Sequence, residues 1–288
     1  METLALSAER QLTVRVWPGR GKPLVLLHGL LDTSAAWNTV AQNATRPCYA
    51  LDLPGFGESS LPTHNTIDSY AQDVTAALGI LGIDGFDLIG HSLGGAIATV
   101  LAEAHPEKVR SLTLFAPVGF GRVAAAELGR LPMADRIVSK TVQLALARPL
   151  ATRMIFAAFV ANGQKPTSSM VDELRAHAEP WSRGTACAVQ AILRICDGSG
   201  ALHRRWLRYK GPVRVLWGAR DMLVPVSHAK ALACCLPQAE ITVWPGMGHY
   251  PQHERADELD NYLSAVSSRA PKTGRIKPPV IRTAPALA

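Results

Sequence analysis

A serine set between glycines is the first group in this sequence that could do chemistry. Residues 90–94, GHSLG, follow the apolar run Phe86–Ile89 and open a stretch rich in small residues. The pattern G-x-S-x-G between a strand and a helix is typical of a nucleophilic serine on a sharp turn, where glycines avoid collisions. A helix beginning there would also present free N–H groups to a developing anion. We therefore predict that Ser92 is a nucleophile.

A serine hydroxyl is a weak nucleophile at neutral pH, so it needs a base and an acid that orients the base. His249 and Asp221 are the candidates, because they follow the apolar runs Glu240–Trp244 and Val213–Trp217. Serine, acid, histidine is the chain order of such a triad on an α/β sheet, where loops at the carboxyl ends of parallel strands share one edge. We therefore expect Ser92, Asp221 and His249 to meet at that edge.

Other histidines and acids fit these two roles less well. His91 adjoins Ser92, and neighbours on a tight turn point apart, which favours a structural role. His253, four residues after His249, favours a surface position. Asp197 is the main competitor as the acid, but it falls in a segment without strands.

A second turn supplies candidate donors for an oxyanion. Residues 28–31, HGLL, follow an apolar run, and Gly29 permits a turn that points a backbone N–H inward. Preorganised N–H groups stabilise the negative oxygen of a tetrahedral intermediate. We assign these donors to the backbone amides of Leu30 and Leu93, with Gly29 beside the substrate. The plainer alternative is that Gly29 merely ends a strand.

The elements that must position these residues alternate along the chain. Apolar runs typical of strands lie at 12–17, 23–28, 47–53, 86–90, 111–116, 213–217 and 240–244, and helical spacing at 68–81, 93–104 and 254–267. Such alternation predicts an α/β fold with a mainly parallel sheet. Residues 119–211 break the pattern, because they show helical segments and no convincing strand. We therefore divide the chain into an α/β core (1–118 and 212–267), an inserted helical cap (119–211) and a tail (268–288).

The cap would lie over the active site, and its side chains would select the substrate. Its expected helices are 123–131, 136–147, 151–160, 169–178 and 186–196. Four cap side chains could line an apolar pocket, and they equally suit the interior of the cap: Met154, Phe156, Phe159 and Trp181. Tyr250, beside the expected catalytic histidine, is a further candidate for the pocket lining. The cap holds 14 Lys or Arg against six Asp or Glu, which suits either an anionic small-molecule substrate or a solvated basic face.

Composition argues against a membrane-spanning, secreted, nucleic-acid-binding or metal-binding protein. The chain has a net charge of +7 and 48% hydrophobic residues, and no apolar run reaches the ~20 residues of a membrane span. The acidic N-terminus lacks the basic start of a signal peptide, so we expect a cytoplasmic protein. The tail is basic but lacks the aromatics of a nucleic-acid arm, which favours a disordered, solvated tail. Five cysteines without CxxC spacing favour free thiols, and we expect no metal and no cofactor.

Five segments together resemble the α/β-hydrolase superfamily, in its branch of small capped serine enzymes. They are LHGL at 27–30, DLPGFGES at 52–59, IGHSLGG at 89–95, WGARD at 217–221 and GHYP at 248–251, in the order of the family. The resemblance implies the fold, the triad and a helical cap after the sixth strand of the family sheet. Haloalkane dehalogenases and epoxide hydrolases of this superfamily carry aspartate at the position of Ser92, and carbon–carbon hydrolases often carry tryptophan at that of Tyr250.

We therefore expect a carboxylesterase-like hydrolase that forms an acyl-enzyme on Ser92. Its substrate would be the ester, lactone or thioester of a small molecule. One alternative is a carbon–carbon hydrolase or lyase that uses the same three residues. The other is a non-catalytic binding protein of the same fold, although no member of the triad is missing.

Overall fold

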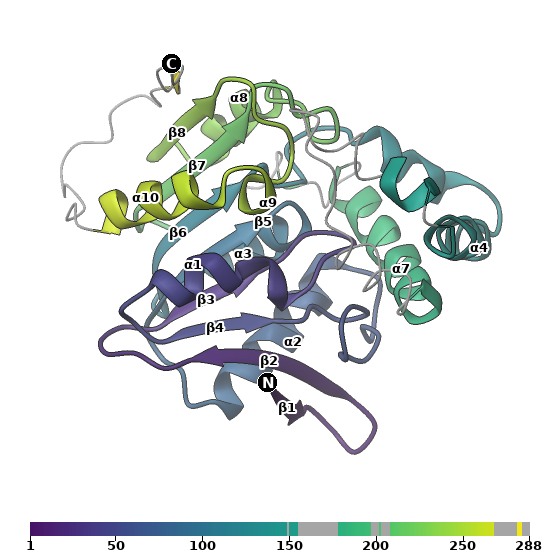
Figure 1. Ribbon diagram of the computed structural model, residues 1–288, viewed down its shortest axis with the longest axis horizontal. Coiled ribbons are helices and arrows are strands. Elements are labelled where there is room, and N and C mark those ends of the chain that lie inside the picture. The colour runs from purple at the N-terminus through teal and green to yellow at the C-terminus, as the bar shows by residue number, and fades with distance from the viewer. Residues whose placement is uncertain (149, 155–177, 197–201, 203–207, 268–280, 284–288) are drawn as a thin grey trace.

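A nine-stranded sheet organises the chain, which the computed structural model describes at residues 1–148, 150–154, 178–196, 202, 208–267 and 281–283 (Figure 1). Its order is β1-β2-β4-β3-β5-β6-β7-β8-β9. The strands are β1 (Glu2–Ala5), β2 (Gln11–Trp17), β3 (Leu24–Leu27), β4 (Cys48–Leu51), β5 (Phe86–His91), β6 (Val109–Phe115), β7 (Val213–Gly218), β8 (Ala239–Trp244) and β9 (Ile281–Thr283). Every neighbouring pair from β4 to β9 is parallel, and only β1, β2 and β4 pair antiparallel. The predicted α/β fold with a mainly parallel sheet is confirmed.

Helices cover both faces of the sheet, which explains why its strands read as continuous apolar runs. In β3, Leu24 and Leu26 face the core that η1 (Ser34–Trp37), α1 (Asn38–Asn43) and α10 (Ala256–Ser267) cover. Val25 and Leu27 face the opposite core, under α2 (Ile67–Ile80), α3 (Leu93–Ala104) and α8 (His228–Cys235). The alternation follows from the two-residue period of a strand.

The cap elements stand beside the sheet and follow β6 in the chain (Figure 1). They include η2 (Ala124–Arg130), α4 (Ala134–Leu146) and α7 (Ala178–Cys196), and α4 packs on α7 through Val138, Ala186 and Val189. No strand occurs in the described part of 119–211. The expected helices at 151–160 and 169–178 lie mostly outside the described residues.

Helix α7 begins at Ala178 rather than at the expected Ala186, and Pro180 falls in its first turn. Proline is tolerated there, since the N–H that it lacks would have no partner in the helix. The longer helix carries Gly184 onto the core. A Cβ on Gly184 would lie 2.0 Å from the carbonyl oxygen of Gly55, so cap and core touch main chain to main chain.

The tail differs from expectation at one place. Ile281–Thr283 form β9 and pair in parallel with β8, where the sequence predicted disorder. Ile and Thr are β-branched and suit a strand, and the open edge of β8 offers unpaired backbone groups. The rest of the tail lies outside the described residues. None of the described helices has the length and hydrophobicity needed to cross a bilayer.

Candidate active site

Ser92 occupies the turn between β5 and α3 with a backbone that only glycine adopts easily. Its φ is 52° and its ψ is −111°, and such strain in a residue with a side chain persists only where surrounding contacts fix it. Its N–H donates to the carbonyl of Phe115 at 2.9 Å, and its own carbonyl accepts from the N–H groups of Ala96 and Val118, both at 3.2 Å. The strand, strained turn and helix predicted around Ser92 are present.

The glycines of this turn are required by close backbone contacts. A Cβ on Gly90 would lie 2.3 Å from the carbonyl oxygen of Gly94, and one on Gly94 would lie 2.5 Å from that of His28. Real Cβ atoms do not approach so closely, so side chains at either position would push the turn apart. The turn that carries Ser92 is therefore packed directly against the end of β3.

Asp221 and His249 meet at the carboxyl ends of β7 and β8. Nδ1 of His249 lies 2.7 Å from Oδ2 of Asp221, and both side chains are buried. Oδ1 of Asp221 accepts the N–H groups of Leu223 and Val224, each at 2.9 Å. The carboxylate thereby holds the ring with its proton on Nδ1, which leaves Nε2 free to act as a base. The competitor Asp197 lies outside the described residues.

The predicted oxyanion turn lies against the nucleophile. A Cβ on Gly29 would lie 3.3 Å from Cβ of Ser92 and 2.7 Å from Nδ1 of His91, so only glycine fits there. Within the described residues, the N–H groups of Leu30 and Leu93 donate no hydrogen bond. Both amides are therefore without a hydrogen-bond acceptor among the described residues.

His91 has the structural role that its sequence position favours. Its Nε2 donates to the carbonyl of His249 at 2.8 Å, and its Nδ1 accepts from the side-chain amide of Gln252 at 3.0 Å. Burial, and then the neighbouring His249, hold the pKa of His91 well below its usual value, so the ring stays neutral. The rings of His91 and His249 lie 4.8 Å apart, which places the base beside the nucleophile turn.

His28 is likewise fixed by two hydrogen bonds and is not a base. Its Nδ1 donates to the carbonyl of Gly29 at 2.7 Å, and its Nε2 accepts the N–H of Leu53 at 2.9 Å. Burial lowers its pKa, which suits a neutral ring that must both donate and accept.

Glu254 is a buried carboxylate that sequence reasoning missed. It ends the short helix α9 (Pro251–Glu254), and its two oxygens accept the N–H groups of Gly248 at 2.9 Å and Tyr250 at 3.0 Å. These amides flank His249, so one side chain holds the loop of the base on both sides. A glutamate in a first helical turn that follows proline is a pattern in which the side chain reaches back to a free N–H, and this signal could have identified it.

Tyr250 differs from the expected pocket-lining role. The side chain is buried, and its hydroxyl donates to the carbonyl of Leu30 at 3.1 Å. His253, expected at the surface, is partly buried and places Nε2 2.9 Å from Oδ2 of Asp32. Burial alone would raise the pKa of Asp32, but the contact with His253 outweighs it and the pKa is lowered.

The remaining residues predicted to line the pocket differ in their exposure to solvent. Met154 is 65% exposed, which argues against its lining an enclosed pocket. Trp181 is buried and packs edge to face on Phe56 at 6.4 Å, so it joins the cap to the core. Phe156 and Phe159 lie outside the described residues.

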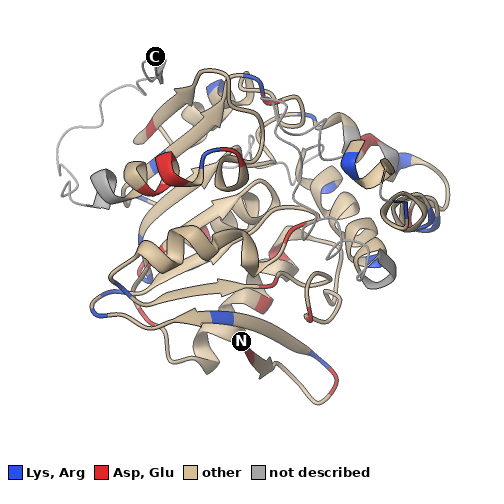
Figure 2. Cartoon of the chain, viewed as in Figure 1, with Lys and Arg blue, Asp and Glu red and all other residues tan. Residues whose placement is uncertain are grey.

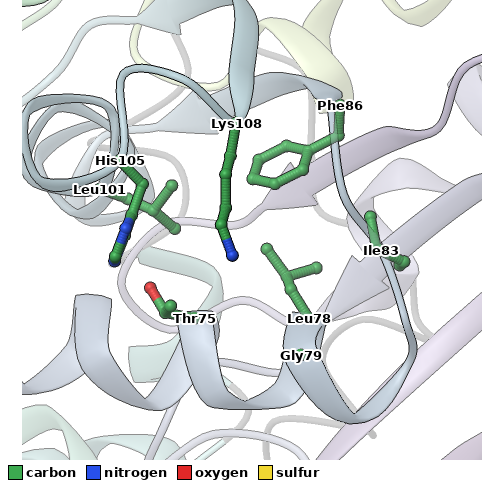
Figure 3. Close-up of a pocket in the computed structure, with 8 residues that line it drawn as sticks. All are labelled: Thr75, Leu78, Gly79, Ile83, Phe86, Leu101, His105 and Lys108. Carbon is green, nitrogen blue, oxygen red and sulfur yellow. The ribbon is translucent and has the colours of Figure 1, made fainter.

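A hollow elsewhere on the molecule is separate from this site. It lies between α2 and α3 near the start of β5, with Phe86, His105 and Lys108 among its lining (Figure 3). Ser92 follows the opposite end of β5, so the length of this strand separates the two places.

Comparisons with known proteins identify the family of the chain. Residues 22–256 match the family described as alpha/beta hydrolase fold. The dihydrolipoyllysine-residue acetyltransferase component of an acetoin cleaving system from Pseudomonas putida is 33% identical over 253 residues, which are 85% of this chain and 63% of that protein. A 2-hydroxymuconate semialdehyde hydrolase from Pseudomonas putida is 29% identical over 265 residues, covering 87% of this chain and 90% of that protein.

A solved structure shows the same fold. A thermophilic esterase from Thermogutta terrifontis superposes with a TM-score of 0.70 at 24% identity, covering 92% of this chain and 96% of that chain. The chain thus spans less than two thirds of one curated relative and nearly the whole length of two other proteins. With the parallel sheet and the strained serine between β5 and α3, the matched residues show that this chain belongs to the α/β-hydrolase family.

Proposed function

We propose that the protein is a serine hydrolase that cleaves a carboxylic ester, or a related lactone or thioester, of a small molecule. The observation that carries the proposal is the strained backbone of Ser92, set against Gly29, while the ring of the neighbouring His91 lies 4.8 Å from that of His249 in the buried His249–Asp221 pair. A serine with φ of 52° is costly to hold, and such strain concentrates at catalytic positions.

The reaction would proceed through an acyl-enzyme. Nε2 of His249 takes the proton of the Ser92 hydroxyl, and Oγ attacks the substrate carbonyl. The amides of Leu30 and Leu93 donate to the oxygen of the tetrahedral intermediate. His249 then protonates the leaving group, and the C–O or C–S bond breaks. A water molecule, deprotonated by His249, attacks the acyl group and releases a carboxylic acid and free Ser92, while Asp221 stabilises the imidazolium form.

Labelling with a fluorophosphonate tests the nucleophile directly. We expect the wild-type protein to form a covalent adduct on Ser92, and Ser92→Ala to form none. Hydrolysis of a nitrophenyl ester should fall by at least about a thousandfold in the variant, because the oxyanion donors and binding alone retain little rate. Equal labelling of the two proteins would contradict the assignment, and absence of labelling in both would favour a binding protein.

Carbon–carbon hydrolysis is a second candidate, favoured by the likeness to the 2-hydroxymuconate semialdehyde hydrolase over 90% of its length. The same serine, base and donors would serve a carbon-bound leaving group. A substrate panel of nitrophenyl ester, lactone, thioester and 2-hydroxymuconate semialdehyde separates the two candidates by kcat/KM. Higher kcat/KM on the semialdehyde than on every ester would replace our proposal with the second one.

The charge of the cap supports an anionic substrate. Residues 131–154 include four basic residues, Arg136, Lys140, Arg148 and Arg153, and one acid, Asp135. Figure 2 shows basic residues on the cap helices. All four basic side chains are exposed, so their field reaches solvent. An anionic substrate would therefore be drawn toward the side of the molecule that carries the cap.

Steering of this kind depends on salt. We expect kcat/KM for an anionic ester to fall severalfold between about 10 and 500 mM salt, because screening shortens the range of the field. A neutral ester of similar size is the control, and its kcat/KM should stay flat. The double variant Arg136→Gln/Lys140→Gln should flatten the profile of the anionic ester. Identical profiles for the two esters would exclude steering by the cap.

A further inference from the structure

The oxyanion loop, residues 28–33, contains a second strained residue. Leu31 has a φ of 55°, and its side chain makes that conformation unfavourable. The preceding Leu30 carries the amide that we assign to the oxyanion. A loop with a residue in this region relaxes unless neighbouring groups fix it, and relaxation would turn the Leu30–Leu31 peptide, the unit that directly follows the Leu30 N–H.

One segment of the chain holds both sides of Leu31. We call residues 250–254 the histidine segment, because they directly follow His249. On one side of Leu31, the hydroxyl of Tyr250 donates to the carbonyl of Leu30 at 3.1 Å. On the other side, Oδ2 of Asp32 lies 2.9 Å from Nε2 of His253 and 3.4 Å from the side-chain nitrogen of Gln252.

The histidine segment is itself fixed to the base. Both oxygens of Glu254 accept the amides that flank His249, and Gln252 donates to His91 next to the nucleophile. Tyr250 is 3% exposed, and burial raises its pKa far above its usual value, so its hydroxyl remains a donor. The positions of the base and of the oxyanion loop are therefore set by the same few side chains.

We propose that the hydroxyl of Tyr250 is a positioning group that holds the Leu30 amide in place relative to His249. This inference rests on the proposed hydrolase function. Tyr250 makes no chemical step of its own. It acts through the Leu30 carbonyl, and the Asp32–His253 pair supports the same loop from the other side of Leu31.

The variant Tyr250→Phe removes one oxygen atom and tests this role. Displacement of an oxyanion donor lowers the rate without weakening ground-state binding, so we expect kcat to fall about tenfold while KM changes less than about twofold. Hydrogen–deuterium exchange of peptides covering 28–33 should become faster. Tyr262→Phe is the matched control, because that hydroxyl bonds to Thr242 on β8, away from the site. Its kcat and the exchange of 28–33 should match the wild type.

The outcomes separate this inference from the function on which it rests. Absence of fluorophosphonate labelling in the wild type would remove the proposed function, whereas exchange in 28–33 still reports whether Tyr250 holds the loop. Labelling and kcat of Tyr250→Phe equal to those of Tyr262→Phe would overturn the positioning role. Should Tyr250→Phe fail to fold, His253→Ala tests the opposite side of Leu31. We expect it to lower kcat more than it changes KM, and an unchanged kcat would count against the inference.

Discussion

At the scale of single residues, Asp221 sets the protonation of the base through the donors that it accepts. Its Oδ1 is occupied by two backbone N–H groups, from Leu223 and Val224, so only Oδ2 faces His249. An oxygen that can only accept requires a proton on Nδ1 of the ring. The lone pair then lies on Nε2, where Ser92 needs it.

Asp221→Asn should reverse this arrangement. The two backbone donors would keep the amide oxygen of Asn at the Oδ1 position, so its NH₂ group would face Nδ1 of His249 and force the proton onto Nε2. We expect kcat for a nitrophenyl ester to fall by about 10³–10⁴ with little change in the melting temperature. Asp84→Asn, at a side chain 81% exposed, is the control and should keep full activity. A variant at position 221 with near wild-type kcat would show that Asp221 does not orient the base.

At the scale of elements, the strands from β2 to β8 were predictable because their environment is uniform, whereas β1 at the edge of the sheet was not predicted. β3 and β5 are covered on both faces, which explains why Leu24–Leu27 and, apart from the ion-paired Asp87, Phe86–Ile89 are apolar. The turn at 90–94 was predictable for a local reason, since a Cβ on Gly90 would collide with the backbone of Gly94 and Gly95. In both cases the information lies in neighbouring positions of the chain.

Elements whose form depends on distant contacts were not predictable. Tyr250 and Leu30 are separated by 220 positions, and nothing near either residue signals their hydrogen bond. Strand β9 exists because β8 has a free edge, which the tail sequence does not encode. Helix α7 was predicted only from Ala186, whereas it begins at Ala178, and its Pro180 is compatible with a helix only because it falls in the first turn.

At the scale of the whole molecule, the cap meets the core through main-chain atoms. Gly55 lies in the turn after β4 with a φ of 87°, and Gly184 lies on α7 opposite it. A Cβ on either residue would come within 2.6 Å of the other chain segment. No side chain can be inserted at this contact without moving the helix.

Gly184→Ala should therefore lift α7 from the core. We expect a loss of about 1–3 kcal/mol in the free energy of unfolding, as for an overpacked interior, and a severalfold higher KM with a smaller change in kcat. Gly79→Ala on α2 is the matched control, because its Cβ would meet nothing within 4 Å and should leave stability equal or higher. Thermal unfolding and ester kinetics measure both. An unaltered melting temperature and KM for Gly184→Ala would mean that α7 adjusts freely.

The contact between Gly55 and Gly184 also bears on how the specificity of such a protein can evolve. Main-chain atoms are the same whatever side chains a cap carries, so the distance between α7 and the turn after β4 does not depend on the lining of the cap. Exchanges elsewhere in 119–211 can then alter the shape and charge of that lining one step at a time. Two glycines thus hold α7 at a constant distance from the core while the side chains around it change.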